Sequence, residues 1–425
     1  MNPISNISDS KITVGLDIGS KSIKCAIGEI KAANSNVKLL GVSEMESAGI
    51  KKGVIIDRDI LLDRIEKVIN DAELMADEKV TKLSLSITGD HIKCINTQSA
   101  ISLNHTNGLS NGIKEKVIGD SDILRVLGSS QSISLPIDRD ILHTIPQEYS
   151  VDMLDEIKNP VGMIGRRLES KVHLVTAATT AMSNIANCVE ELGLSVENIV
   201  FQPLASALAV IDEDEMELGI TLVELGYTTT NIAVYQKGSI KHSAVLPIGS
   251  KSITNDIAVM LQISIKEAEE IKIKYASALS SMSSSDLMIE FSKTFKNKSA
   301  SISENEVSKY VEARTQEIFQ MVFQEISKAD VKDPLTYGIV LTGGGALMRN
   351  IVPMLEKTLS IKARIGQSIK IEAAKDVADG PNFTTCMGLL LWPLHTTDFS
   401  QLRSNQNKSF KGILKRIRHT IENMF

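Results

Sequence analysis

The stretch Leu16-Asp17-Ile18-Gly19-Ser20 decides the fold class, because it lies between two strand-like runs, 12–14 and 23–27. This pattern predicts a β-hairpin with a carboxylate and a glycine at its tip. Glycine lets backbone N–H groups approach a phosphate, and Ser20 adds a hydroxyl donor. The Asp17 carboxylate would repel a bare phosphate, so we expect Mg²⁺ with its waters between them. Taken alone, the stretch also fits an ordinary hairpin turn.

Length and composition bound the possible classes of protein. A chain of 425 residues is too long for one core, so two or more domains are expected. A net charge of −6 and few aromatic residues argue against a nucleic-acid partner. The four cysteines form no C-x-x-C pair, which fits a reducing cytoplasm and not a zinc site. With no signal peptide and no apolar run of about 18 residues, we expect a cytosolic body.

The second half of the chain repeats the organisation of the first half. Strand patterns at 12–18, 22–30 and 37–46 are followed by a helical pattern at 57–76. Later, strand patterns at 219–225, 231–235 and 239–247 are again followed by helical patterns, at 251–262 and 264–278. This repeat predicts an α/β fold with an internal duplication and a cleft between the halves.

Two later loops complete a candidate nucleotide site. Glu224-Leu225-Gly226-Tyr227-Thr228-Thr229 again runs from an acid through a glycine to hydroxyls. Leu341-Thr342-Gly343-Gly344-Gly345-Ala346 reads as a strand that runs straight into a helix, where bare backbone can lie against adenine or phosphate. Three glycines between a strand and a helix also fit a simple tight turn. Together, the three loops predict a nucleotide site.

In this order, the loops resemble those of the actin, heat-shock-70 and sugar-kinase superfamily. The resemblance implies two ribonuclease H-like domains that clamp ATP and Mg²⁺ in the cleft. It implies that Glu269 and Lys272, on one helix face, reach the ribose, and that Gln202 orients an attacking water. Gln202 also fits a surface glutamine. The resemblance implies that Asp17 and Glu224 hold Mg²⁺ through water and that Gln202 and Glu224 are catalytic residues. The implied nucleotide-binding residues are Asp17, Gly19, Ser20, Ser22, Lys24, Gly226, Tyr227, Thr228, Thr229, Glu269, Lys272, Gly343, Gly344, Gly345 and Met348.

Over essentially its whole length, the chain also resembles the FtsA family of bacterial cell-division proteins. The most specific segments are 143–149, 159–163 and 167–169, together with Asn255-Asp256-Ile257-Ala258. The resemblance implies an actin-like filament that recruits the tubulin-like FtsZ ring to the inner face of the cytoplasmic membrane at the division site. It also implies an inserted subdomain that contacts later division proteins. The implied boundaries are 1–83 plus 163–210 (first actin-like domain, subdomain 1A), 84–162 (inserted subdomain 1C), 211–260 plus 330–397 (second actin-like domain, subdomain 2A), 261–329 (subdomain 2B), 398–409 (flexible linker) and 410–425 (amphipathic membrane helix).

The second phosphate loop departs from the superfamily pattern, which is usually Asp-x-Gly-Gly-Gly-Thr-x-Asp. Glu224 places its carboxylate one methylene further out, and Asn231 has lost a charge. Tyr227 and Thr228 stand where glycines give backbone access, so Tyr227 either blocks the cleft or stacks within it. Errors of about 1 Å near the reacting atoms can cost about 100-fold in rate. We therefore expect ATP to act mainly as a structural ligand, with slow or absent turnover.

The C-terminal segment predicts a reversible membrane anchor. The polar residues from Asp398 to Lys408 suit a flexible linker, and a basic amphipathic pattern follows. One such helix should bind an anionic surface weakly, and many on one filament tightly, because linked sites raise the effective concentration. A helix that folds back on the body is the alternative. The residues expected at the membrane are Phe410, Ile413, Leu414, Lys415, Arg416, Ile417, Arg418, Ile421, Met424 and Phe425.

A partner surface is expected on the helix predicted at 303–329. There, Arg314 matches an arginine that the FtsA family places in the pocket for the acidic FtsZ C-terminal peptide. Lys293, Lys296 and Lys298 lie nearby in sequence and would suit the same charge, although they also fit a plain solvated turn.

Two other functions fit part of the sequence. A pilus-assembly ATPase of the same superfamily would share the opening stretch at 16–24, but the segments at 146–148 and 162–163 and the basic tail argue against it. A sugar kinase needs a catalytic aspartate and a deep sugar pocket, and no motif marks either of them. Neither enzyme would explain a membrane-binding tail.

Overall fold

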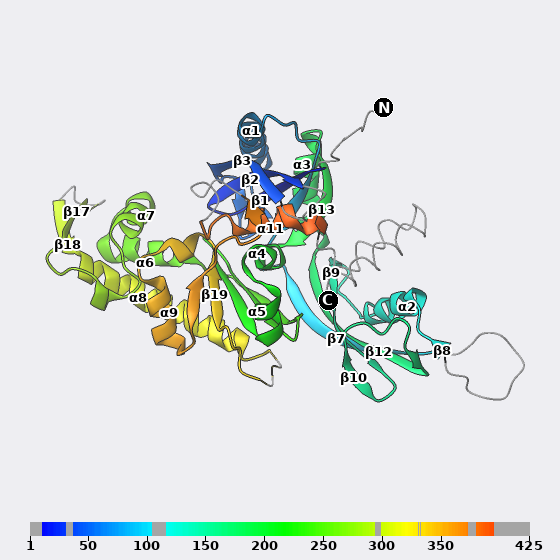
Figure 1. Ribbon diagram of the computed structural model, residues 1–425. Helices are drawn as coiled ribbons and strands as arrows, with labels where there is room; N and C mark the ends of the chain where they lie inside the picture. The colour runs from blue at the N-terminus through cyan, green and yellow to red at the C-terminus, as the bar shows by residue number, and fades with distance from the viewer. Residues whose placement is uncertain are drawn as a thin grey trace, which may run out of the picture.

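The computed structural model describes residues 11–30, 37–103, 116–293, 299–329, 331, 333–372 and 380–394. Two α/β domains form its centre, and a smaller subdomain projects from the first of them (Figure 1). Within these residues, no helix is both long and apolar enough to cross a bilayer.

The first domain contains a six-stranded sheet in the order β13-β6-β1-β2-β3-β21. β1, β2 and β3 pair antiparallel, and β6 and β13 add on in parallel. The side chain of Asp57 caps helix α1 by accepting from the backbone of Ile60, which satisfies one free N–H group at the helix start. The bounds are β1 Lys11–Ile18, β2 Ser22–Ile30, β3 Val37–Glu46, β4 Ile50–Lys51, β5 Val54–Ile55, α1 Arg58–Ala76, β6 Lys82–Ile87, α3 Thr179–Glu191, β13 Ser195–Phe201 and β21 Ile371–Glu372.

The second domain contains a five-stranded sheet in the order β16-β15-β14-β19-β20. Again three strands pair antiparallel and two add on in parallel, so the connectivity repeats that of the first sheet. The predicted duplication is therefore confirmed by strand order. The bounds are α5 Glu213–Leu218, β14 Ile220–Leu225, β15 Thr230–Gln236, β16 Ser239–Leu246, α6 Ser250–Leu261, α7 Ile265–Lys274, η1 Ser280–Met282, β17 Met288–Ser292, β18 Ser299–Ser303, α8 Glu304–Ile326, β19 Ile339–Thr342, η2 Gly344–Leu347, α9 Ile351–Leu359 and β20 Ala363–Ile365.

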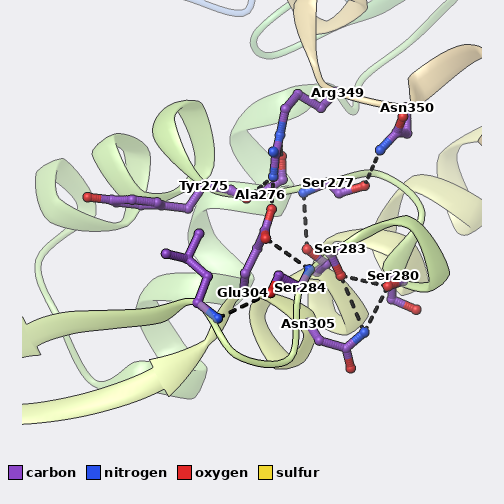
Figure 2. A network of polar contacts seen from close by, with 12 residues as sticks. Tyr275, Ala276, Ser277, Ser280, Ser283, Ser284, Glu304, Asn305, Arg349 and Asn350 are labelled. Atoms are coloured by element: carbon purple, nitrogen blue, oxygen red, sulfur yellow. Dashed lines mark hydrogen bonds and ion pairs between the residues drawn. The ribbon is translucent and has the colours of Figure 1, made fainter.

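A polar network ties four parts of the second domain together (Figure 2). Arg349, just before α9, pairs with Glu304 at the start of α8 and donates to the backbone oxygens of Tyr275 and Ala276 beyond α7. The backbone of Ser284 donates to the other oxygen of Glu304 at 2.9 Å. Because Glu304 is buried, this pairing satisfies a carboxylate that would otherwise destabilise the fold.

Helices α4 (Gln202–Val210) and α11 (Thr384–Leu391) pack between the two sheets. One apolar cluster surrounds them and includes residues of both sheets, such as Val200 and Leu222. Gly388 makes their close approach possible, because a Cβ at this position would lie 1.7 Å from the backbone oxygen of Ala205. The short helix η3 (Trp392–Leu394) follows α11.

The inserted subdomain is a four-stranded sheet, β10-β9-β12-β7, with α2 packed against it. Its sheet runs from β7 to β12 in the sequence, whereas β6 belongs to the sheet of the first domain. The sequence pattern predicts a helix over 113–128, and the structure begins helix α2 at Asp120. The sequence over 135–153 predicts strand pieces broken by prolines, but β9 continues through Pro146, which lies beside a register shift. The bounds are β7 Lys93–Ser102, β8 Lys116–Val117, α2 Asp120–Ser130, β9 Arg139–Val151, β10 Leu154–Ile157, β11 Ile164–Gly165 and β12 Arg167–Ala178.

The insert also contacts the edge strand of the second domain. The side-chain amides of Gln147 and Asn96 donate to the backbone oxygens of Ile240 and Lys241 in β16, at 2.6 and 2.8 Å. These bonds cover carbonyls that an open sheet edge would expose. The insert is thus held by both domains.

We predict that Gly388→Ala lowers the free energy of unfolding by about 3 kcal/mol, because the added methyl collides with helix backbone. Urea denaturation followed by circular dichroism measures this change. Gly128→Ala in α2 is the matched control, since a Cβ there meets nothing within 4 Å. Gly128→Ala should raise the free energy of unfolding by about 0.5–1 kcal/mol. If both substitutions changed the free energy of unfolding equally, the packing argument would be contradicted.

Candidate functional site

The tips of the β1–β2 and β14–β15 hairpins have the same backbone geometry. In the first, Gly19 N–H donates to the Ser22 oxygen at 3.1 Å, and in the second, Gly226 N–H donates to the Thr229 oxygen at 3.0 Å. A Cβ on either glycine would lie 2.8 Å from that acceptor. Both glycines are therefore required by the turn itself, and the two loops are structural counterparts.

The two hairpin tips meet across the boundary between the domains. The Thr228 hydroxyl donates to the Ser20 hydroxyl at 2.8 Å. Of the other residues expected here, Thr229 and Ser22 are buried beside their turns. Lys24 is buried opposite Asp17 in the β1–β2 ladder, with its ammonium 3.5 Å from Glu44.

Both expected carboxylates are buried and accept several hydrogen bonds. Asp17 accepts from Ser86 at 2.6 Å, and Glu224 accepts from Thr385 at 2.7 Å and from Ser206 at 3.2 Å. Burial raises the pKa of Asp17, and the charge of Lys24 opposes this shift. Burial likewise raises the pKa of Glu224, and the negative charge of Asp17 adds to the increase.

Gln202 connects the two carboxylates instead of lying on the surface. Its amide nitrogen donates to Asp17 at 3.2 Å, and its amide oxygen accepts from Asn231 at 3.1 Å. Asn231 also donates to Glu224 at 2.9 Å and accepts from Thr88 at 2.6 Å. Sequence reasoning recognised the changed residue Asn231 but not its partners.

The third glycine loop differs from its prediction. Instead of entering a helix at once, the chain makes the 3₁₀ turn η2 before α9 begins at Ile351. Gly343, with φ +84°, and Gly345 press against Leu225, where a Cβ would come within 2.6 and 2.4 Å of it. These two glycines are therefore explained by packing. Gly344 alone has open space around its Cβ position, and Met348 packs partly buried on the core of the second domain.

Glu269 and Lys272, the residues expected to reach a ribose, form an ion pair on helix α7. Lys272 donates to Glu269 at 2.8 Å and to the Thr254 hydroxyl at 2.8 Å. The other Glu269 oxygen lies 3.6 Å from the ammonium of Lys21, which comes from the first hairpin. These charges lower the pKa of Glu269 despite its burial, so it is ionised at neutral pH. The ring of Tyr227 lies among the same lysines.

The donor set around Asp17 and Glu224 fits a magnesium ion that is bound mainly through water. Carboxylate oxygens are the ligands that Mg²⁺ prefers, and a cation would compensate two buried charges. Among the residues that the structure describes, no group of three or more acidic, histidine or cysteine side chains forms a metal cage. The remaining ligands would have to be waters and phosphate oxygens.

Arg314, the residue expected to bind a peptide, is already paired in the free chain. Its guanidinium donates to both oxygens of Asp256 on α6, at 2.6 and 3.0 Å, and it also pairs with Glu317. Lys293 lies half-buried just after β17. Lys296, Lys298 and the expected membrane segment 410–425 lie outside the described residues.

The duplicated fold and facing hairpins define a protein of the actin-like class. A solved PilM–PilN type IV pilus biogenesis complex is similar over 89% of this chain and 97% of that chain, with a TM-score of 0.62 and 16% identity. MreB5 of Spiroplasma citri bound to ADP is similar over 94% of this chain and 99% of that chain, with a TM-score of 0.51 and 13% identity.

Sequence comparison then defines the family. The family model described as "Cell division protein FtsA" matches residues 221–388, and that of the "SHS2 domain inserted in FTSA" matches 89–176. Cell division protein FtsA of Pseudomonas aeruginosa is 33% identical, over 99% of this chain and 100% of the relative. Its counterpart in Neisseria meningitidis serogroup B is 34% identical, over 96% of this chain and 98% of the relative. This chain belongs to the FtsA family of cell division proteins. With the pilus protein it shares the fold.

We predict that Glu224→Gln stabilises the nucleotide-free protein at neutral pH, because it removes a buried charge and keeps the side-chain shape. Since the folded-state pKa lies above the ordinary 4.5, the wild-type carboxyl favours folding most at low pH and loses that contribution as pH rises through its raised pKa. The gain in Tm should therefore shrink as pH falls toward 4.5. Thermal melts across this range measure it.

Glu217→Gln is the control, because Glu217 forms an exposed ion pair with Lys158. Its Tm should follow the wild type closely at each pH. A Glu224→Gln gain that stayed constant with pH would contradict the assignment of a raised pKa.

Proposed function

We propose that this chain is an actin-like cell-division protein that holds Mg–ATP between its two domains and polymerises on the inner face of the cytoplasmic membrane. The observation that carries the nucleotide proposal is the contact between Thr228 and Ser20, which brings two matching hairpin tips together. Such tips present hydroxyl and backbone donors to phosphate. Asp17 and Glu224 would hold the magnesium ion through water, and the bound ion would neutralise phosphate charge.

We further propose that ATP is turned over slowly. Both ends of the Gln202 amide are used by protein partners, Asp17 and Asn231, so reaching a water would break this network. Tyr227 stands where a glycine would otherwise open the loop backbone to phosphate. These features favour ATP as a ligand that joins the domains.

We assign the partner surfaces as follows. Arg314 and Lys293 would attract the acidic C-terminal peptide of FtsZ, with Asp256 as the group that the peptide must displace. The tip of the insert exposes apolar side chains around the β8–β11 pair and the β9–β10 turn, and this surface suits later division proteins. The segment 410–425 would lie on the anionic membrane, so the protein would be peripheral at the division site.

The deciding experiment is co-sedimentation of the full chain with anionic liposomes, with and without Mg–ATP, and with electron microscopy of the pellets. We expect filaments on lipid with ATP, because linked tails bind cooperatively. A chain lacking 410–425 should stay in the supernatant. Phosphate release in the same mixture should remain far below the ordinary enzyme median of about 10 per second.

Two results would overturn the proposal. Equal sedimentation without 410–425 would remove the role of that segment. Turnover near the ordinary enzyme value would show that the altered loop supports catalysis.

Arg314→Gln should weaken binding of an FtsZ C-terminal peptide at least about 10-fold, since the peptide loses its cation. Glutamine is the better replacement, because a glutamate at position 314 would also be repelled by Asp256 and Glu317 and so would disturb the fold. Asp256→Asn is the informative partner variant. It frees the guanidinium from its internal ion pair and should bind the peptide at least as tightly as the wild type.

Fluorescence anisotropy with a labelled peptide measures both variants. If Arg314→Gln bound like the wild type while its melting curve was unchanged, the peptide site would lie elsewhere.

A further inference from the structure

The ring of Tyr227 has three lysine ammonium groups around it. Lys21 lies 5.2 Å, Lys251 5.5 Å and Lys272 5.8 Å from the ring centroid, all within the range of cation–π attraction. They come from three elements: the first hairpin, the first turn of α6, and α7. Positively charged side chains from both domains therefore surround the ring.

Carboxylates balance only part of this charge. Glu269 uses one oxygen for Lys272, at 2.8 Å, and the other for Lys21, at 3.6 Å. In the described part of the chain, Lys251 contacts the ring and no carboxylate within ion-pair distance. Like charges this close repel each other, so the cluster favours an anion.

Two backbone donors next to the ring, both at the start of α6, are already occupied. At the start of α6, Ser250 N–H donates to the Gly226 oxygen at 2.9 Å, and Lys251 N–H donates to the Tyr227 oxygen at 2.8 Å. Free N–H groups at a helix start would otherwise serve a phosphate. An anion beside the ring therefore cannot use these two N–H groups, and side chains must supply that part of its binding.

We propose that Tyr227 is a specificity-determining residue that assembles Lys21, Lys251 and Lys272 into a subsite for the polyphosphate of a nucleotide. The lysines supply the charge recognition that glycines would supply through backbone N–H groups. When phosphate attracts Lys21, one oxygen of Glu269 becomes free for a ribose hydroxyl. This inference rests on the proposed nucleotide binding and adds that affinity depends on the number of phosphates.

The test is calorimetric titration of the full chain with Mg–ATP, Mg–ADP, AMP and adenosine. Tyr227→Phe keeps the ring and should bind each ligand within about 2-fold of the wild type. Tyr227→Leu removes the ring and should lower the affinity for ATP about 10-fold. The loss of affinity should be smaller for ADP and almost absent for adenosine.

Lys251→Gln provides a second measurement if the leucine variant does not fold. It should weaken ATP binding and flatten the dependence of ATP affinity on salt. Lys266→Gln is its control, because it removes the same charge from an exposed position on α7. It should bind like the wild type.

Different failures have different meanings. If the wild type bound no nucleotide, the proposed function would fail. If the wild type bound ATP but Tyr227→Leu and Lys251→Gln bound it equally well, only the role of Tyr227 would fail. Tighter ATP binding by Tyr227→Gly would show that the ring obstructs the site and would also overturn the inference.

Discussion

Two buried carboxylates, Asp17 and Glu224, set the constraint on which the rest of the site depends. Buried charges are costly unless they are paired or fully hydrogen-bonded. Here neutral donors from both domains surround them: Ser86 beside the first, and Ser206, Thr385 and Asn231 around the second. Ser86 lies in the same sheet as Asp17, whereas Ser206 and Thr385 reach Glu224 from helices α4 and α11. Glu224 is therefore satisfied only when these two helices and the second sheet meet correctly.

The two domains repeat the same backbone arrangement, but their side chains differ at equivalent positions. The residue opposite Asp17 in its hairpin ladder is Lys24, whereas the residue opposite Glu224 is Asn231. One acid therefore faces a cation, and the other faces an amide that donates to it and also accepts from Thr88. The first copy carries its own neutralising charge, while the second depends on hydrogen bonds from neighbouring elements.

Much of this could be predicted from the sequence, and the reason is local. Glycine at a hairpin tip and the Glu269–Lys272 spacing are signals within a few residues, and the structure confirms the turns and the shared helix face. Thr385 and Thr88 carry no such signal, because an isolated hydroxyl gains its role only when distant segments meet. Gly343 and Gly345 are a different case: the sequence predicts ligand contact, and the structure adds that both glycines also pack tightly against Leu225.

The apolar cluster around α4 and α11 has a consequence for how the molecule can be divided. It contains side chains from both sheets and from the insert, among them Val200, Leu222 and Val175. If the chain were cut at the boundary between the repeats, each fragment would expose the apolar surface that the other now covers. Such exposure favours aggregation over independent folding. The two repeats therefore share one core, and each depends on the other to cover its apolar surface.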